Sequence, residues 1–466
     1  MILDELMKNN KNNLISFHVP GHKNGKIYDL LGYKDLLESI YKMDTTEIIG
    51  TDNLHSPEGI IKKSQEKASR VFKSDKTYFL VNGTTCGIQA SIMSICNDND
   101  KILVNRDCHH SVINACILGN INPVYIDYKL DNDYFILEGV LEEDVIKSID
   151  ENLDAKALVL TYPTYYGATY DLEKICEYAH KKNMVVIVDE AHGAHLGLSE
   201  KLPKTALEQG ADIVIQSTHK TLPSFTQSSM LHIKGGKVDS SKISEILRII
   251  ETSSPSYLLM SSLEIATEIY EKYGRDLMDK LLENIDNFIK DISKNDFVKV
   301  YNKFDKTKIF ISLKKLGITG YELEKILRKN NIQVELSNYY GVLLICTISN
   351  YYDDFESIKN AINNIITDKK DKYFEELRTI NYPKIIPKKI LNPREAFYKN
   401  KKSVKIYDSI GQISGEYIIP YPPGVSILSP GEIITKEIID YILYLKEMNI
   451  SGISDTSLEN IKIIER

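Results

Sequence analysis

Short apolar runs alternate with longer amphipathic segments between about residues 77 and 235. Six runs have the length of a buried strand: residues 78–81, 102–104, 124–126, 157–160, 185–188 and 213–215. Segments with helical spacing, such as residues 172–182, separate several of them. Short strands that are apolar throughout and alternate with helices predict a mostly parallel sheet covered on both faces. The chain is therefore expected to contain an α/β unit whose site lies at the carboxyl ends of the strands.

A chain of 466 residues is long for one domain and suggests two or three. After the α/β unit come a mainly helical stretch at 241–294 and then mixed segments, strand-like at 308–312 and 342–347 and helical at 320–329 and 354–366. We expect four parts: an N-terminal arm (residues 1–60), a large α/β domain (61–260), a small α/β domain (261–380) and a C-terminal α+β domain (381–466).

Two local patterns mark the C-terminal part. The charged stretch 368–372 leads toward Pro383 and Pro387, which is typical of a linker. A proline-rich turn at 420–424 precedes an amphipathic segment near 433–447, where we expect the final helix.

Composition excludes several classes of protein. Hydrophobic residues at 42% and charged residues at 26% describe an ordinary globular chain. The formal net charge is -7, and lysines are interleaved with acidic residues, so no nucleic-acid partner is expected. The six cysteines lack a CxxC pair or zinc spacing, which favours reduced thiols and no metal site. Neither a signal peptide nor a membrane span is expected, so we predict a cytoplasmic protein without a membrane partner.

A carboxylate and a lysine follow two of the predicted strands. Asp189 comes directly after the run 185–188, and Lys220 ends the sequence Ser217-Thr218-His219-Lys220 after the run 213–215. Pyridoxal 5'-phosphate (PLP) enzymes need this pair. The lysine forms a Schiff base with the cofactor aldehyde, and the carboxylate keeps the pyridine nitrogen protonated. Asp189 and Lys220 are therefore our main catalytic candidates.

Other polar residues could complete such a site. Thr84 and Thr85 lie where a strand passes into a helix, so their hydroxyls and the first helical amides could bind a phosphate. A helix cap without a ligand would use the same residues. His109 could stack on a flat ring or serve as an ordinary loop histidine. Ser217 and His219 lie beside Lys220 and are candidates for the phosphate, although a serine there could also be strand filler.

Motifs along nearly the whole chain resemble one family. Phe17-His18-Val19-Pro20-Gly21-His22-Lys23-Asn24-Gly25 and the segment 50–59 look like the N-terminal signature of the Orn/Lys/Arg decarboxylases of PLP fold type I (aminotransferase-like). Further matching segments follow in the family's order: 82–87, 106–111, 162–167, 189–195, 217–220, 252–257, 392–396 and 420–424. The chain resembles the shorter members, which lack an N-terminal wing domain.

This resemblance implies roles for individual residues. Lys220 matches the Schiff-base lysine, Asp189 the partner of the pyridine nitrogen and His109 the residue stacked on the ring. The implied cofactor-binding residues also include Thr84, Thr85, His192, Ser217 and His219. Ser254 matches a position that reaches the phosphate of the neighbouring subunit, which implies a homodimer with shared sites and allows a higher oligomer. The chain departs from the family at His110, often lysine, and at Asp107, often asparagine.

The cofactor site alone would permit transamination, racemisation, aldol cleavage or decarboxylation. No arginine occurs between Arg328 and Arg378, where an aminotransferase commonly binds the substrate α-carboxylate. A firm ion pair there would stabilise the ground state of a decarboxylase rather than its transition state. We therefore favour decarboxylation, with Lys220 or His219 returning a proton to Cα. Another fold type I enzyme, such as an aminotransferase or aldolase, and a non-catalytic regulatory protein are the alternatives.

The family implies a basic L-amino acid as substrate, so the site needs an acceptor for a cationic side chain. Asp52 and Glu335 are our candidates, with Asp44, Glu47 and Glu58 behind them; any of these could instead be a solvated surface carboxylate. Arginine is favoured, giving agmatine and CO2, and lysine or ornithine remains possible. The short form of the chain favours a role in polyamine biosynthesis.

Overall fold

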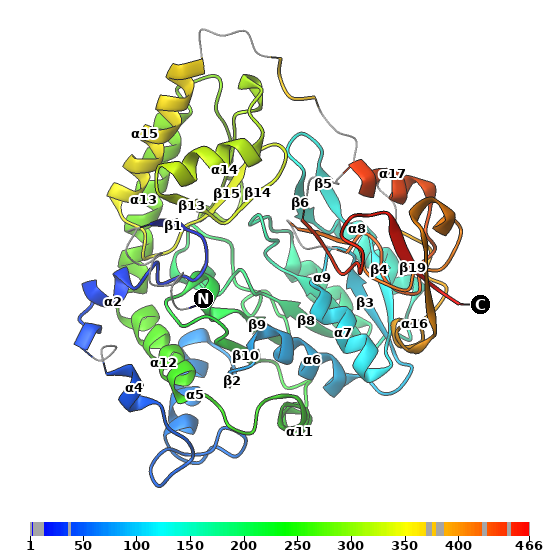
Figure 1. Ribbon diagram of the computed structural model, residues 1–466. Helices are drawn as coiled ribbons and strands as arrows, with labels where there is room; N and C mark the ends of the chain where they lie inside the picture. The colour runs from blue at the N-terminus through cyan, green and yellow to red at the C-terminus, as the bar shows by residue number, and fades with distance from the viewer. Residues whose placement is uncertain are drawn as a thin grey trace.

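The computed structural model describes residues 2, 14–35, 39–369, 375–378, 386–421, 426–444 and 449–465. Its centre is a seven-stranded sheet, here the large sheet, with the order β2-β10-β9-β8-β7-β3-β4 (Figure 1). Its strands are β2 (Lys76–Leu80), β3 (Lys101–Asn105), β4 (Asn122–Ile126), β7 (Ala157–Thr161), β8 (Val185–Asp189), β9 (Ile213–Gln216) and β10 (Ser229–Ile233). Strands β9, β8, β7, β3 and β4 are parallel, whereas β10 is antiparallel to β2 and β9. The predicted fold class, α/β with a mostly parallel sheet, is confirmed.

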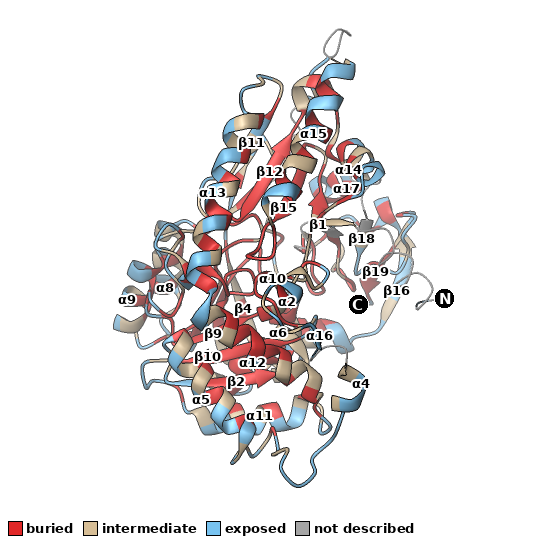
Figure 2. Cartoon of the chain, turned by 90° about the vertical axis from the view of Figure 1, so that its left-hand side faces the viewer, coloured by how far each residue is buried: buried red, intermediate tan, exposed pale blue. Residues whose placement is uncertain are grey.

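Helices cover both faces of the large sheet, because alternate residues of its apolar strands point to opposite sides. Ile187 packs into one core, and its neighbours Val186 and Val188 pack into the other. One face carries α6 (Gly83–Ile95), α7 (His110–Gly119) and α11 (Ser240–Ile250). The other carries α5 (Ile60–Phe72), α8 (Glu142–Glu151), α9 (Leu172–Lys181) and α12 (Tyr257–Lys272). Figure 2 shows the strands buried between helices whose outer faces are exposed.

All six strands predicted for the large sheet are confirmed, and β10 is the strand of that sheet that was missed. Its sequence, Ser-Met-Leu-His-Ile, interrupts an apolar run with a histidine. His232 is nevertheless buried, because its ring nitrogens lie 2.8 Å from Thr77 Oγ1 and 3.1 Å from Gln216 Oε1. Polar neighbours on the adjoining strands thus make a buried histidine possible.

A second unit contains a four-stranded sheet, here the small sheet, with the order β11-β12-β15-β14. Its strands are β11 (Lys299–Tyr301), β12 (Lys308–Ser312), β14 (Leu336–Ser337) and β15 (Val342–Ile345), packed with α13 (Gly274–Ile292), α14 (Gly320–Lys329) and α15 (Tyr352–Lys369). The predicted segments are confirmed, although β15 ends earlier and α15 is longer than expected. Near the N-terminus, β1 (Ile15–Phe17) pairs in parallel with β13 (Ile332–Val334), a contact that the sequence did not predict.

The C-terminal segment (residues 386–465) contains α16 (Pro393–Tyr398), α17 (Lys436–Tyr444) and two strand pairs. In these pairs β16 (Lys401–Lys405) joins β19 (Asn460–Ile464), and β17 (Ile419–Tyr421) joins β18 (Asn449–Ser451). In Figure 1 this segment lies to the right of the large sheet, and the small sheet lies above. Much of the predicted linker, residues 422–424 of the predicted turn and the end of the predicted last helix lie outside the described residues.

The division of the chain at residues 60, 260 and 380 stays a prediction. Smaller elements are α2 (Lys26–Leu30), α4 (Ile40–Met43) and the hairpin of β5 (Lys129–Asp131) and β6 (Ile136–Gly139). Within the described residues, no helix combines the length and the apolar character needed to cross a bilayer.

Candidate active site

Asp189 and Lys220 face one cavity at the carboxyl edge of the large sheet. Asp189 is the last residue of β8, and Lys220 lies on the short helix α10 (Thr218–Thr221) that follows the neighbouring strand β9. The cavity has a volume of about 390 Å³. The predicted residues that line it are Thr84, Thr85, His109, Asp189, His192, Ser217, His219 and Lys220. Residues up to 136 positions apart in sequence (84 to 220) thus meet because parallel strands end at the same edge.

The two charged groups alter each other's proton affinity. Burial lowers the pKa of Lys220, and the negative charges of Asp189 and Glu335 oppose that shift. Burial raises the pKa of Asp189, and the lysine partly offsets it. Lys220 Nζ also lies 3.0 Å from His192 Nε2. The lysine is therefore held at a defined position and is easier to deprotonate than a lysine in water.

Hydroxyls and backbone amides gather at one end of the cavity. Thr84 Oγ1 lies 2.5 Å from Ser217 Oγ and 2.8 Å from Ser229 Oγ. Gly83 begins α6 with a φ of 77°, a left-handed conformation that favours glycine, and the N-cap side chain of Asn82 makes no capping hydrogen bond. The first turn of α6 therefore presents uncapped N–H groups beside these hydroxyls, an arrangement suited to an anion.

Two histidines in the cavity are held neutral. His219 Nδ1 lies 2.8 Å from the Ser228 carbonyl oxygen and must donate to it, which leaves Nε2 without a proton. Burial and the Lys220 charge outweigh that bond and lower the pKa of His219 to about 4. His109 Nδ1 accepts from the Ser111 N–H at 3.3 Å. Removal from water, followed by His110 and Lys220, lowers the pKa of His109 to about 3. Neither imidazole carries a charge near neutral pH.

The three remaining candidates do not line this cavity. The Asp52 carboxylate accepts backbone N–H groups at the start of α5, including those of Gly59 at 2.7 Å and Ile61 at 3.0 Å. It therefore caps a helix, and its part in substrate binding stays a prediction. Glu335 lies directly behind the lining residue Tyr165, whose hydroxyl donates to its Oε1 at 2.5 Å. Ser254 is exposed on the loop before α12.

Several lining residues were not predicted: Asp107, Thr161, Tyr165, Ile419 and Ser451. Asp107 stood out only as a departure from the family pattern. It is buried, and burial raises the pKa of its carboxyl, although Asn105 donates to it at 2.6 Å. Ile419 and Ser451 come from the C-terminal segment, and no local pattern marks them. They could be found only from the tertiary contact between that segment and the large sheet.

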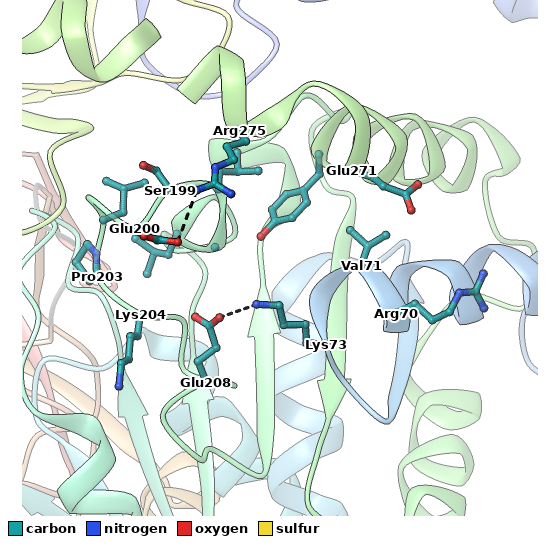
Figure 3. A pocket seen from close by; sticks show the side chains of 15 residues that line it. Arg70, Val71, Lys73, Ser199, Glu200, Pro203, Lys204, Glu208, Glu271 and Arg275 are labelled. Carbon is teal, nitrogen blue, oxygen red and sulfur yellow. Dashed lines mark hydrogen bonds and ion pairs between the residues drawn. The ribbon is translucent and has the colours of Figure 1, made fainter. Parts of the chain in front are cut away.

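A larger and more open cavity of about 890 Å³ lies between α5, α12 and the segment 196–204 (Figure 3). Of the described residues that line it, none belongs to the predicted site. Lys73 is 2.9 Å from Glu208 and Arg275 is 3.6 Å from Glu200, so these opposite charges are paired. The chemistry expected from the sequence is confined to the smaller cavity.

Comparisons with known proteins agree with this geometry. Residues 2–310 match the family described as Orn/Lys/Arg decarboxylase, major domain, and residues 375–451 match its C-terminal domain. A Bacillus subtilis protein named arginine decarboxylase is 35% identical over 97% of this chain and 95% of its own length. One with the same name from Halalkalibacterium halodurans is 36% identical over 98% and 95%. The Francisella novicida lysine decarboxylase LdcF has a similar fold, with a TM-score of 0.80 at 24% identity over 99% of this chain and 80% of its own.

The fold and the site define a PLP-dependent enzyme of fold type I. The chain belongs to the Orn/Lys/Arg decarboxylase family and is a PLP-dependent decarboxylase. The residues present fit the cofactor, because one cavity joins an anion-binding helix start, a buried carboxylate and a lysine. The expected cofactor and enzyme class are thus confirmed.

Proposed function

We propose that the chain decarboxylates L-arginine to agmatine and CO2. The observation that carries the proposal is the position of Asp189 and Lys220, which face one cavity from adjacent strand ends. The names of relatives at 35–36% identity over nearly the full chain favour arginine over lysine or ornithine. Agmatine is a precursor for polyamines, so a role in polyamine synthesis in the cytoplasm follows from the proposal. All six cysteines are free, which is compatible with that compartment.

In this proposal, different lining residues bind different parts of PLP. Lys220 would hold the cofactor aldehyde, and Asp189 would keep the pyridine nitrogen protonated. Thr84, Thr85, Ser217 and His219 would hold the phosphate together with the first turn of α6, and His109 and His192 would contact the cofactor from the cavity wall. When bound, the cofactor supplies an electron sink for the pair released as the Cα–carboxylate bond breaks.

The proton returned to Cα comes from Lys220 rather than from His219. His219 Nε2 carries no proton while Nδ1 donates to Ser228, and the low pKa of the ring keeps it so. Lys220 has a lowered pKa and a polar partner, His192, which suits an amine that gives and regains a proton in each turnover.

No arginine occurs among the described residues that line the cavity. The substrate α-carboxylate therefore meets no guanidinium from this wall of the site. A strong ion pair would be lost when CO2 leaves and would raise the barrier to decarboxylation. This feature supports decarboxylation over transamination.

Two chains share the active sites in our proposal. Ser254 is exposed in the single chain, as expected for a residue that contacts a neighbouring subunit. Ile48 and Ile49 on the N-terminal arm are 60% and 105% exposed, unusual for adjacent isoleucines unless a partner covers them. Asp52 lies on the same arm, so its part in substrate binding, if any, belongs to the partner's cavity. Light scattering should give the mass of a dimer, and replacing both isoleucines by serine should lower it.

The decisive experiment supplies arginine, lysine and ornithine separately to the PLP-loaded protein. We expect CO2 and agmatine from arginine, with much less cadaverine or putrescine from the other two. Lys220→Ala serves as the control for non-enzymatic release. Turnover that requires a keto-acid acceptor would identify an aminotransferase instead, and no CO2 from any of the three would overturn the proposal.

A further inference from the structure

A buried lysine lies behind the cavity wall and takes no part in the mechanism above. Lys308 begins β12, and its side chain is fully buried beside the apolar residues 309–311 of that strand. Its Nζ is 3.9 Å from Asp305 Oδ2 and has no hydrogen-bond partner among the described residues. A buried ammonium without hydrogen bonds is costly, so its retention calls for a function.

The surroundings of Lys308 connect it to the cavity wall. A Cβ at Gly167 would lie 2.7 Å from Lys308 Cγ, so this side chain packs on the loop that carries Tyr165. Burial lowers the pKa of Lys308, and Asp305, then Glu335 and Cys346, favour its charged form. Asp305 neutralises the ammonium only in part, because it also contacts His195 Nε2 at 3.1 Å and accepts from Thr307 Oγ1 at 2.8 Å. The positive charge is thus placed directly behind the wall and only partly neutralised.

His192 contacts the catalytic lysine and is close enough to Lys308 for that charge to lower its pKa. Its Nε2 lies 3.0 Å from Lys220 Nζ, while its Nδ1 is buried and has no partner in the described part of the chain. The Tyr165 ring packs on it at 4.6 Å between centroids. Besides the Tyr165 phenol, the titratable groups that most affect its pKa are Lys220, Lys308, His109 and His219, and none of these four is an acid. Burial and then the charges of Lys220 and Lys308 lower the pKa of His192 well below its ordinary value.

We propose that Lys308 is a positioning residue, whose buried ammonium keeps His192 neutral so that His192 Nε2 accepts a hydrogen bond from Lys220 and orients its Nζ. The inference rests on the proposed decarboxylation. There the Cα–carboxylate bond breaks, CO2 leaves, the electron pair stays with Cα, and Cα gains a proton from Lys220. Lys220 regains that proton from solvent, so each turnover consumes one proton. A protonated His192 would repel Lys220 and leave no acceptor to hold it.

The test compares Lys308→Met, which removes the charge, with Lys308→Arg, which keeps it. For Lys308→Met we expect kcat at the optimal pH to fall about tenfold, with KM little changed. The acidic limb of the plot of kcat against pH should move up by about one pH unit. Lys308→Arg should restore the wild-type limb. Lys299→Met on the exposed strand β11 is the control for loss of a lysine and should change neither parameter.

A second readout does not depend on activity. In cofactor-free protein carrying ¹³Cε1-histidine, the His192 resonance, assigned by its loss in His192→Gln, should titrate at a higher pH in Lys308→Met than in the wild type. If Lys308→Met does not fold, Asp305→Asn serves as the test variant. Because it removes the negative charge beside Lys308, it should move the acidic limb of the kcat profile to lower pH. An unchanged His192 titration, or a loss of kcat equal at every pH, would overturn the inference. Absence of CO2 release with the expected His192 titration would reject the proposed function alone.

Discussion

Arg106 and Lys308 are two buried cations that lie behind different walls of the cavity. They differ in how far neighbouring groups neutralise their charges. The Arg106 guanidinium donates to both Glu432 oxygens, at 2.5 and 2.9 Å, and stacks 4.6 Å from the Tyr125 ring. Lys308 Nζ lies 3.9 Å from the Asp305 carboxylate and makes no hydrogen bond to the described residues. Arg106 ties the large sheet to the C-terminal segment, which supplies Ile419 and Ser451 to the cavity. Lys308 joins the small sheet to the same cavity.

This difference in pairing indicates that the two cations have different roles, one structural and one electrostatic. In a bidentate ion pair each partner neutralises the charge of the other. Such a pair fixes the positions of the two side chains and has little effect on the pKa of neighbouring groups. A cation with an incomplete partner keeps an electric field that can change the pKa of neighbouring groups. We infer that the C-terminal wall is held rigidly, whereas the small-sheet wall tunes the proton affinity of the site.

The largest effect should follow from changing the cation that faces the cavity itself. Lys220→Ala removes the amine that links the cofactor and returns the proton, so we expect CO2 release to fall by at least a factor on the order of 10⁴. The visible absorbance of bound cofactor should change at the same time. If the spectrum and the rate matched the wild type, Lys220 would have neither role.

Asp189→Asn should have the next largest effect. An amide keeps the shape of the side chain but cannot hold a positive charge on the pyridine nitrogen, so we expect a rate loss on the order of 10³-fold with the cofactor still bound. Equilibrium dialysis measures the retention and CO2 release the rate. Full loss of cofactor would instead make Asp189 mainly a binding residue.

The sequence predicts the part of the site whose residues lie at the ends of strands. Asp189 and Lys220 each follow a short apolar run, and parallel strands bring such positions to one edge without further information. The same logic located the strands of the large sheet except β10, where the buried polar residue His232 broke the pattern.

The other part depends on contacts that have no local signature. Lys308 opens a strand, a position that is usually solvated, and only the packing of Gly167 and Asp305 buries it. Asp52 caps α5 across a loop of seven to ten residues rather than at the usual three-residue spacing. The sequence therefore contains no sign of its role as a cap.

A smaller effect, on stability, tests the rigid wall. Glu432→Gln leaves the Arg106 charge buried with one good acceptor fewer, and we expect a loss of roughly 3 kcal/mol in the free energy of unfolding. The matched control is Glu395→Gln, whose partner Lys399 lies 3.5 Å away at the surface, and there the change should stay below about 1 kcal/mol. Chemical unfolding measures both. Equal stability of the two variants would remove the contrast between the walls.

A pH-dependent effect concerns Lys23, which shares the small-sheet side with Lys308 but has two hydrogen-bond acceptors, the His18 and Ile345 carbonyls at 2.6 and 2.9 Å. Burial lowers the pKa of Lys23 from 10.5 to about 7. The folded protein therefore releases this proton at lower pH than the unfolded chain, so the lysine costs stability below pH 7 and the cost fades as pH rises toward 10.5.

Unfolding of the wild type and of Lys23→Met should consequently be compared between pH 6.5 and 9.5. We expect the stability of the wild type to rise relative to the variant across this range, whereas the exposed Lys299→Met should show a constant difference. A flat difference for Lys23→Met would mean that the two carbonyls hold the ammonium charged at its ordinary pKa. Lys23 would then resemble the saturated Arg106, and Lys308 alone would remain as the unsaturated cation of the small-sheet wall.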